Sequence, residues 1–202
     1  SPMSLLFRVA FVTIFSLVHQ AAFAAETAWR AASAKTKITP EAPMWMAGYA
    51  ARNKPSEGVA QDLFAKTLVI EDADGARLAI VTLDLIGIPR PLREGLEQAA
   101  EAKFGLPPAS LLLNASHTHC GPELRARRMQ DDDRDPARIA QAVEYANQLQ
   151  STIVSMIGDC LNRLEPVKLG YSHGRCGFAM NRRLPTDGGP RNSPYPDGPV
   201  DH

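Results

Sequence analysis

The stretch RLAIVTLDL, residues 77–85, decides the fold expected for this chain. Its β-branched and aliphatic residues are typical of a strand within a sheet. A second run of this kind, residues 67–71, precedes it, and Asp-Ala-Asp-Gly at residues 72–75 separates the two. Asp and Gly tolerate the backbone angles that tight turns need. The sequence therefore predicts a β-hairpin here.

A helix and another strand follow this hairpin. Residues 91–104 begin with proline, which suits the first turn of a helix, and Gly105 suits its end. One helical face is apolar and consists of Leu92, Leu96, Ala99, Ala100 and Phe104. Residues 111–114, Leu-Leu-Leu-Asn, form a short apolar strand. Strand, helix and strand in one sheet predict a right-handed parallel crossover, so that both strands end at the same edge.

Polar residues follow both of these strand ends. Asp84 lies at the end of the first strand, and His117 and His119 come directly after the second, before Cys-Gly-Pro at residues 120–122. Imidazole is a common zinc ligand, and side chains two residues apart in an extended segment point to the same side. Because ligands of open α/β sheets collect outside the carboxyl ends of parallel strands, we expect these three residues to converge on one site.

The residues alone leave alternatives open at this site. A single His-x-His pair is as compatible with two histidines satisfied at a turn as with a metal site. Asp84 suits a helix or loop cap as well as a role in orienting a histidine.

A long helix is predicted from Asp135, a good N-cap, and Pro136 to residue 164, where Glu-Pro at 165–166 stops it. Apolar residues recur along it at steps of three and four and predict one buried stripe: Ile139, Val143, Ala146, Leu149, Ile153, Ile157, Cys160 and Leu164. We assign this helix no catalytic role. The charged residues 125–133 before it favour a solvated loop, with a lid near the site as the alternative.

After the long helix, residues 167–173 alternate in polarity and predict a half-exposed strand, and residues 185–199 look unstructured. The chain has 202 residues with 22 Lys and Arg against 22 Asp and Glu, so bulk charge favours no nucleic-acid partner. Its fold is predicted as α/β, a mixed or largely parallel sheet with flanking helices, in an incomplete domain.

The N-terminus is typical of a secretory signal. Arg8 precedes an apolar run at residues 9–18 and the small-residue site Ala22-Phe23-Ala24. We expect residues 1–24 to be a signal peptide and the chain to be exported to a periplasmic, secreted or cell-surface location. An uncleaved N-terminal anchor is the alternative. The three cysteines, Cys120, Cys160 and Cys176, allow at most one internal disulfide, and buried or free thiols are the favoured interpretation.

The wording around the histidines adds a resemblance. LNASHTHCGP at residues 113–122 resembles the H-T-H-S-G-P segment of the neutral/alkaline ceramidase family, zinc-dependent amidases of sphingolipid metabolism. MAGYA at 46–50 leading to DLFAK at 62–66, and NRR at 181–183, agree in order and spacing. The resemblance covers about residues 35 to 200. Residues 25–202 are therefore expected to be the N-terminal part of such a catalytic domain, truncated at its C-terminus.

The resemblance implies a role for three residues of this chain. His117 matches a zinc-binding histidine, His119 its catalytic neighbour, which stabilises charge on the cleaved amide, and Arg182 an arginine near the substrate. The implied cofactor is Zn²⁺, and the implied partner is ceramide or a related N-acyl lipid, reached with contact to a membrane surface.

This chain also departs from the family pattern. Cys120 stands where the family usually has serine. The family's second zinc histidine, its glutamate and tyrosine ligands and its active-centre serine lie further along the chain than this sequence reaches. We therefore expect weak zinc binding and little turnover from these 202 residues. A ceramidase-like hydrolase of another amide or ester, and a non-catalytic binding module, are the alternatives.

Overall fold

The computed structural model describes residues 29–125, 135–175 and 177–200. The chain divides into two compact units, Ser1–Lys168 and Leu169–His202. The expected signal peptide at residues 1–24 lies outside the described residues, as do Cys176 and residues 126–134 of the charged loop. Export therefore stays a prediction, which N-terminal sequencing of exported chain would check. Among the helices of the described part, none is long and apolar enough to cross a membrane.

The first unit is built on a five-stranded sheet in the order β4-β3-β2-β1-β5. Its strands are β1 (Trp29–Lys37), β2 (Phe64–Glu71), β3 (Arg77–Leu83), β4 (Leu111–Ala115) and β5 (Glu165–Val167). Of the pairings in this sheet, β3 with β4 is parallel, and the others are antiparallel. The predicted α/β class with flanking helices is confirmed, and the sheet is mixed rather than largely parallel.

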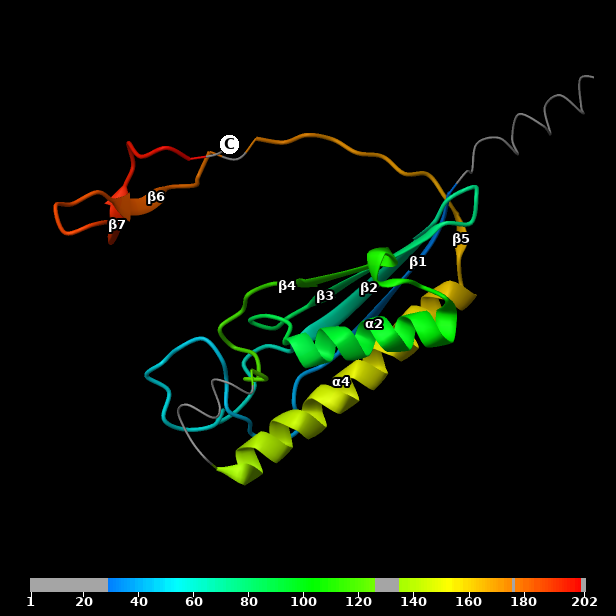
Figure 1. Ribbon diagram of the computed structural model, residues 1–202, viewed down its shortest axis with the longest axis horizontal. Helices are drawn as coiled ribbons and strands as arrows, with labels where there is room; N and C mark the ends of the chain where they lie inside the picture. Colours follow the sequence, from blue (N-terminus) through cyan, green and yellow to red (C-terminus); the bar gives the residue numbers. More distant parts are fainter. Residues whose placement is uncertain (1–28, 126–134, 176, 201–202) are drawn as a thin grey trace, which may run out of the picture. The chain divides into compact units, whose positions relative to one another are not determined.

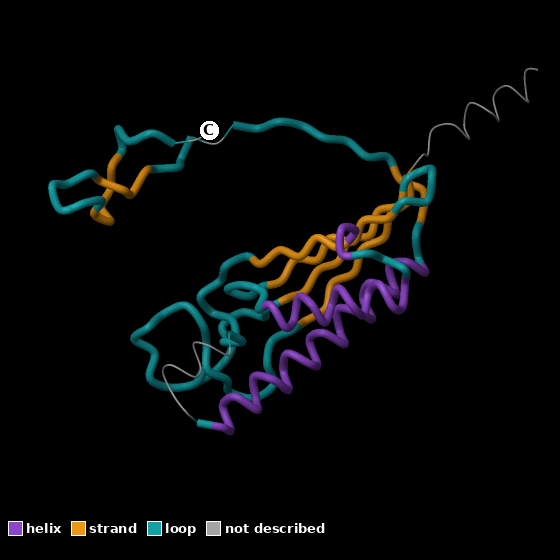
Figure 2. The backbone as a smooth tube through the Cα atoms, in the orientation of Figure 1, coloured by secondary structure: helices purple, strands orange, loops and turns teal. Residues whose placement is uncertain are grey.

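Two helices, α2 (Arg90–Phe104) and α4 (Pro136–Asn162), cover one face of this sheet (Figure 1). The short 3₁₀ helix Pro108–Ser110 leads into β4. Gly105 ends α2 in the left-handed conformation, with φ of 65°. The Asp135 side chain accepts a hydrogen bond from the backbone N–H of Ala137 and so caps α4, as the sequence predicts. Figure 2 shows both helices running along the strands on this same side.

The core lies between the sheet and these helices. Alternate residues of the central strands point into it, because successive side chains of a strand lie on opposite faces. These fully or almost fully buried strand residues are Ala65, Val69, Ala79, Val81 and Leu83. The helices contribute Leu92, Leu96, Ala100, Leu149, Ile153, Ile157 and Cys160. Cys160 is a buried free thiol, and burial raises its pKa.

The predicted stripe of α4 is wrong near its N-terminus. Val143 is 51% exposed, whereas Ala142 is 4% exposed and packs with Met44. This part of the helix contacts the loop that follows β1 rather than the sheet, so the buried face turns by one residue.

The second unit contains a hairpin of β6 (Asn181–Leu184) and β7 (Arg191–Tyr195). The prediction of an unstructured run at 185–199 is wrong for β7. Pro194 is tolerated there because an edge strand of a two-stranded sheet can do without one N–H. The strand predicted at 167–173 is also wrong, since β5 ends at Val167 and no described strand lies beside the residues after it.

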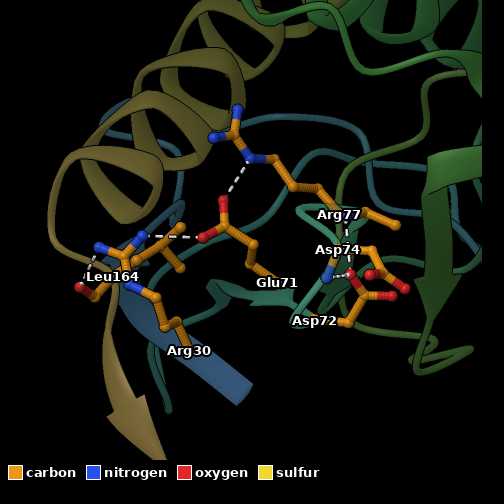
Figure 3. Close-up of polar contacts among 7 residues, drawn as sticks. Arg30, Glu71, Asp72, Asp74, Arg77 and Leu164 are labelled. Carbon is orange, nitrogen blue, oxygen red and sulfur yellow. Dashed lines mark hydrogen bonds and ion pairs between the residues drawn. The ribbon is translucent and has the colours of Figure 1, made fainter. Parts of the chain in front are cut away.

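The buried carboxylate of Glu71, at the end of β2, is linked through Arg30 to the residues that follow α4 (Figure 3). Glu71 lies between two arginines, with its Oε1 2.8 Å from Arg30 Nη1 and its Oε2 2.7 Å from Arg77 Nε. Arg30 also donates to the carbonyl of Leu164 at 3.0 Å. The hydrogen bond from Arg77 and the one from Arg30 hold the pKa of Glu71 below its usual value, against the effect of desolvation.

Substituting Glu71→Gln is expected to reduce the pH dependence of folding stability between pH 7 and pH 3. A carboxyl with a lowered folded pKa stabilises the fold above its unfolded pKa of about 4.3, and this contribution is lost as the pH falls through the folded pKa. The melting temperature of E71Q should therefore lie below wild type at pH 7 and approach it at pH 3, as measured by circular dichroism. The control is E57Q, because Glu57 pairs with Lys54 in solvent. Equal pH dependence in E71Q and wild type would contradict the prediction.

Candidate functional site

The parallel pair β3 and β4 brings the predicted site residues to one edge of the sheet. Leu83 pairs with Ala115 at the carboxyl ends of the two strands. The ladder continues for one more bond, from the N–H of Ser116 to the carbonyl of Leu83 at 3.0 Å. Asp84 follows one strand end, and His117 and His119 follow the other. The expectation that the crossover places all three at the same edge is confirmed.

His117 has an unusual backbone and a defined ring partner. Its φ is 59°, and it is the non-glycine residue with positive φ among those described. Its Nδ1 lies 2.8 Å from the carbonyl oxygen of Ile86. Because a carbonyl oxygen only accepts, Nδ1 carries a proton, which in a neutral imidazole puts the lone pair on Nε2. A backbone carbonyl that orients the imidazole in this way is typical of histidines that bind metals.

His119 is enclosed by two segments of the chain. Its ring lies edge-on to the ring of Tyr49 at 4.9 Å between centroids, and edge-on to the ring of His117 at 5.3 Å. Gly48 lies against it, because a Cβ at this position would be 2.4 Å from Cγ of His119. Gly48 also has φ of 106°, which favours glycine.

The segment that carries Gly48 is held by backbone pairing with the residues after the histidines. The N–H of Ala47 donates to the carbonyl of Gly121 at 2.8 Å, and the N–H of Glu123 donates to the carbonyl of Trp45 at 2.9 Å. Met46 and Pro122 form the bridge between them. This pairing places the loop after β1 beside the histidine turn.

Two cavities lie on either side of the histidine turn. His117 and His119 line one of about 650 Å³, together with Tyr49, Arg52 and Glu123. The intervening and flanking residues line the other, of about 850 Å³: Ser116, Thr118 and Cys120, with Asp84. The two histidines therefore share a cavity, as their spacing predicts, but Asp84 does not share it with them.

The structure places Asp84 as a cap. Its Oδ2 accepts a hydrogen bond from the N–H of Phe64 at 2.9 Å, at the first residue of β2. Its own N–H donates to the carbonyl of Phe64 at 3.0 Å. Of the two roles that the sequence leaves open, the loop cap is the one observed.

The histidine cavity contains several charged groups. Glu123 is buried and accepts from Nε of Arg125 at 2.8 Å. This carboxylate raises the pKa of Arg125. Arg138 lies over the ring of Trp45 at 4.2 Å from its centroid. The cavity is thus polar and predominantly cationic, with aromatic walls.

The described residues hold no group of three or more His, Cys, Asp or Glu side chains arranged to bind a metal ion. His117 and His119 lie together. The thiol of Cys120 is free and exposed, and the backbone N–H of Cys120 donates to Oγ1 of Thr118. Arg182 belongs to the second unit, where it lies exposed on β6. The roles assigned to His117, His119 and Arg182 stay predictions.

Sequence reasoning missed the residues that shape the cavity around the histidines. The carbonyl of Ile86 has no signal in the sequence, since any residue supplies one. Gly48 and Tyr49 were present in the GYA wording used for the resemblance, but only the fold shows that they contact His119.

Comparison with known proteins gives a consistent result. Residues 32–180 match the family described as neutral/alkaline non-lysosomal ceramidase, N-terminal. The structure resembles that of neutral ceramidase from Pseudomonas aeruginosa, with a TM-score of 0.57 and 27% identity, covering 69% of this chain and 22% of the solved chain. It also resembles a structure described as ceramidase complexed with C2, with a TM-score of 0.56, 26% identity and the same coverage. A search of curated proteins finds no match.

Proposed function

This chain belongs to the neutral/alkaline non-lysosomal ceramidase family, whose N-terminal region it matches over residues 32–180, and we propose that it serves the hydrolysis of the amide bond of ceramide or a related N-acyl lipid. The chain spans about a fifth of the solved ceramidases that it resembles, 22% in each case. One of these relatives is described as complexed with C2. Contact with a lipid surface is part of the same proposal.

The observation that carries this proposal is the contact between Nδ1 of His117 and the carbonyl of Ile86. It leaves Nε2 of a cavity-lining imidazole available as a ligand, so the residue fits the zinc role that the family implies. When bound, zinc lowers the pKa of its water towards ~7 and polarises the carbonyl to be attacked. His117 is the described residue that would hold it.

His119 has a different task in this proposal. It lines the same cavity as His117, and its ring lies 5.3 Å from that ring between centroids. An imidazole at this place can donate a hydrogen bond to the amide oxygen as negative charge develops on it. Arg182 is proposed to contact the substrate, as the family's matching arginine implies.

Substituting His117→Asn is expected to weaken zinc binding by more than about tenfold, since even loss of an outer hydrogen-bond partner of a ligand costs this much. Asparagine is chosen because it tolerates the positive φ of this position. Isothermal titration of zinc into the purified 202-residue chain measures the affinity. The control is His173→Asn, because His173 is exposed in the second unit. Unchanged zinc binding in H117N would rule out His117 as a ligand.

The same preparations distinguish the candidate activities. A catalytic zinc site needs three protein ligands and an open position, so the chain alone is proposed to bind zinc weakly and to release little fatty acid from ceramide. Tight stoichiometric zinc with substantial release would overturn this. Bound zinc with hydrolysis of another amide or ester, but not of ceramide, would favour a different substrate, and neither zinc nor hydrolysis would favour a binding module.

A further inference from the structure

The two histidines are the end of a longer series of ring contacts in the same cavity. Cζ of Arg52 lies 5.0 Å from the ring centroid of Tyr49. The ring of Tyr49 lies 4.9 Å from that of His119, with 73° between the ring planes. His119 in turn contacts His117 edge-on at 5.3 Å. All four side chains line the cavity of about 650 Å³.

Two neighbouring residues limit where the His119 ring can lie. On one side is Gly48, at which even a Cβ would come within 2.5 Å of Cβ of His119. On another is Tyr49, whose edge-to-face geometry is the favoured one for aromatic rings. The backbone of this segment is anchored by the hydrogen bond from Ala47 to Gly121. Gly48 and Tyr49 therefore restrict the position of the His119 ring from a backbone segment that is itself held in place.

Arg52 in turn holds Tyr49. Its Nη1 donates to the carbonyl of Ala47, and its N–H donates to the carbonyl of Tyr49 at 3.3 Å. These bonds close a turn that leaves the guanidinium over the tyrosine ring, where a cation is attracted to the aromatic face.

Burial does not explain the place of Tyr49. The residue is 59% exposed, so it contributes little to the core. Its ring contacts the guanidinium of Arg52 and the ring of His119. The contact of this largely exposed side chain with the His119 imidazole, and not burial in the core, therefore accounts for its position.

We propose that Tyr49 is a positioning residue that sets the orientation of the His119 imidazole, with Arg52 keeping Tyr49 in place. A catalytic role for this orientation rests on the proposed function, whereas the orientation of the His119 ring rests on the ring contacts alone. The part of Tyr49 that contacts His119 is its aromatic ring, so phenylalanine should replace it and an aliphatic residue should not.

The test compares Tyr49→Phe with Tyr49→Leu in the metal-free 202-residue chain. An edge-to-face pair changes the population of one side-chain orientation by roughly two- to tenfold. In Y49L, the nuclear Overhauser contact between the His119 ring and the Hα protons of Gly48 should weaken. The rate at which diethyl pyrocarbonate modifies His119, followed by peptide mass spectrometry, should rise by roughly the same two- to tenfold factor. In Y49F, both should stay at wild-type values, and in Arg52→Met they should lie between.

A matched control is Tyr171→Leu, because Tyr171 is 92% exposed in the second unit and contacts His173 edge-on at 5.8 Å. This variant should leave the signals of His119 unchanged. A wild-type melting temperature would show that Y49L is folded. If folded Y49L also keeps the Gly48 contact and the reactivity of His119, the proposal is wrong. Absence of both zinc binding and hydrolysis, with the Y49L effect intact, would instead count against the proposed function and leave the positioning role standing.

Discussion

Gly48→Ala is expected to displace the His119 imidazole and to destabilise the first unit. The new Cβ would lie 2.4 Å from Cγ and 2.8 Å from Cα of His119, a backbone atom that cannot give way by rotation. The φ of 106° adds strain for any residue with a side chain. Residues held in such backbone regions cost about 1–3 kcal/mol each, and the overlap adds to this. Chemical denaturation measures the loss of stability, and the nuclear Overhauser contacts of the His119 ring report its movement.

Two other glycines separate the causes of this effect. Gly75 has φ of 83° but open space around a Cβ, so Gly75→Ala reports backbone strain alone. Gly87 has open space and no positive φ, so Gly87→Ala should be close to neutral. If Gly48→Ala costs no more than Gly75→Ala and leaves the His119 ring in place, the close approach of Gly48 has no effect of its own.

Ile157→Ala is expected to lower the free energy of unfolding by about 2–5 kcal/mol, the range for deleting a fully buried aliphatic side chain. Ile157 is 0% exposed and belongs to the core cluster between α4, α2 and the sheet. The cavity left behind cannot be filled from the sheet side, since the strands are held in register by their neighbours. Urea denaturation followed by circular dichroism measures the change.

The same helix offers a control for this prediction. Val143 also lies on α4, but it is 51% exposed, so Val143→Ala should change the unfolding free energy by less than about 0.5 kcal/mol. Similar losses in the two variants would mean that the packing of α4 differs from that described here.

The elements that the sequence predicts correctly are those with local signals. The hairpin of β2 and β3 follows from Asp72, whose Oδ1 accepts from the N–H groups of Asp74 and Ala76. Pro at the start and Gly105 at the end delimit α2, and Asp135 caps α4. Such signals depend on a few neighbouring residues, so they can be read without the rest of the fold.

The elements that were missed depend on distant partners. The sequence of β1, WRAASAKTK, is rich in alanine and lysine and has little strand propensity. It becomes a strand because it pairs with β2 on one side and β5 on the other. The exposure of Val143 has the same kind of cause, since the periodicity of a helix shows which residues share a face but not what that face meets.

The candidate site divides in the same way. The spacing of His117 and His119 and the crossover before them predict a shared cavity at the sheet edge, as observed. The partner of His117 is a backbone carbonyl, and the wall against His119 is a glycine and an exposed tyrosine. These contacts come from residues distant in the sequence, and the residue types involved do not predict them.

The bridge between Met46 and Pro122 gives the site a stability distinct from that of the core. The elements between these residues, β2, β3, α2 and β4, are held by the core, whereas the two segments that meet at the bridge are joined by two flanking backbone hydrogen bonds. Small units of this kind can open while a hydrophobic core stays folded. Opening of this kind would separate Gly48 and Tyr49 from the histidine turn without global unfolding, so the arrangement of the imidazoles depends on this contact and not on the His-Thr-His segment alone.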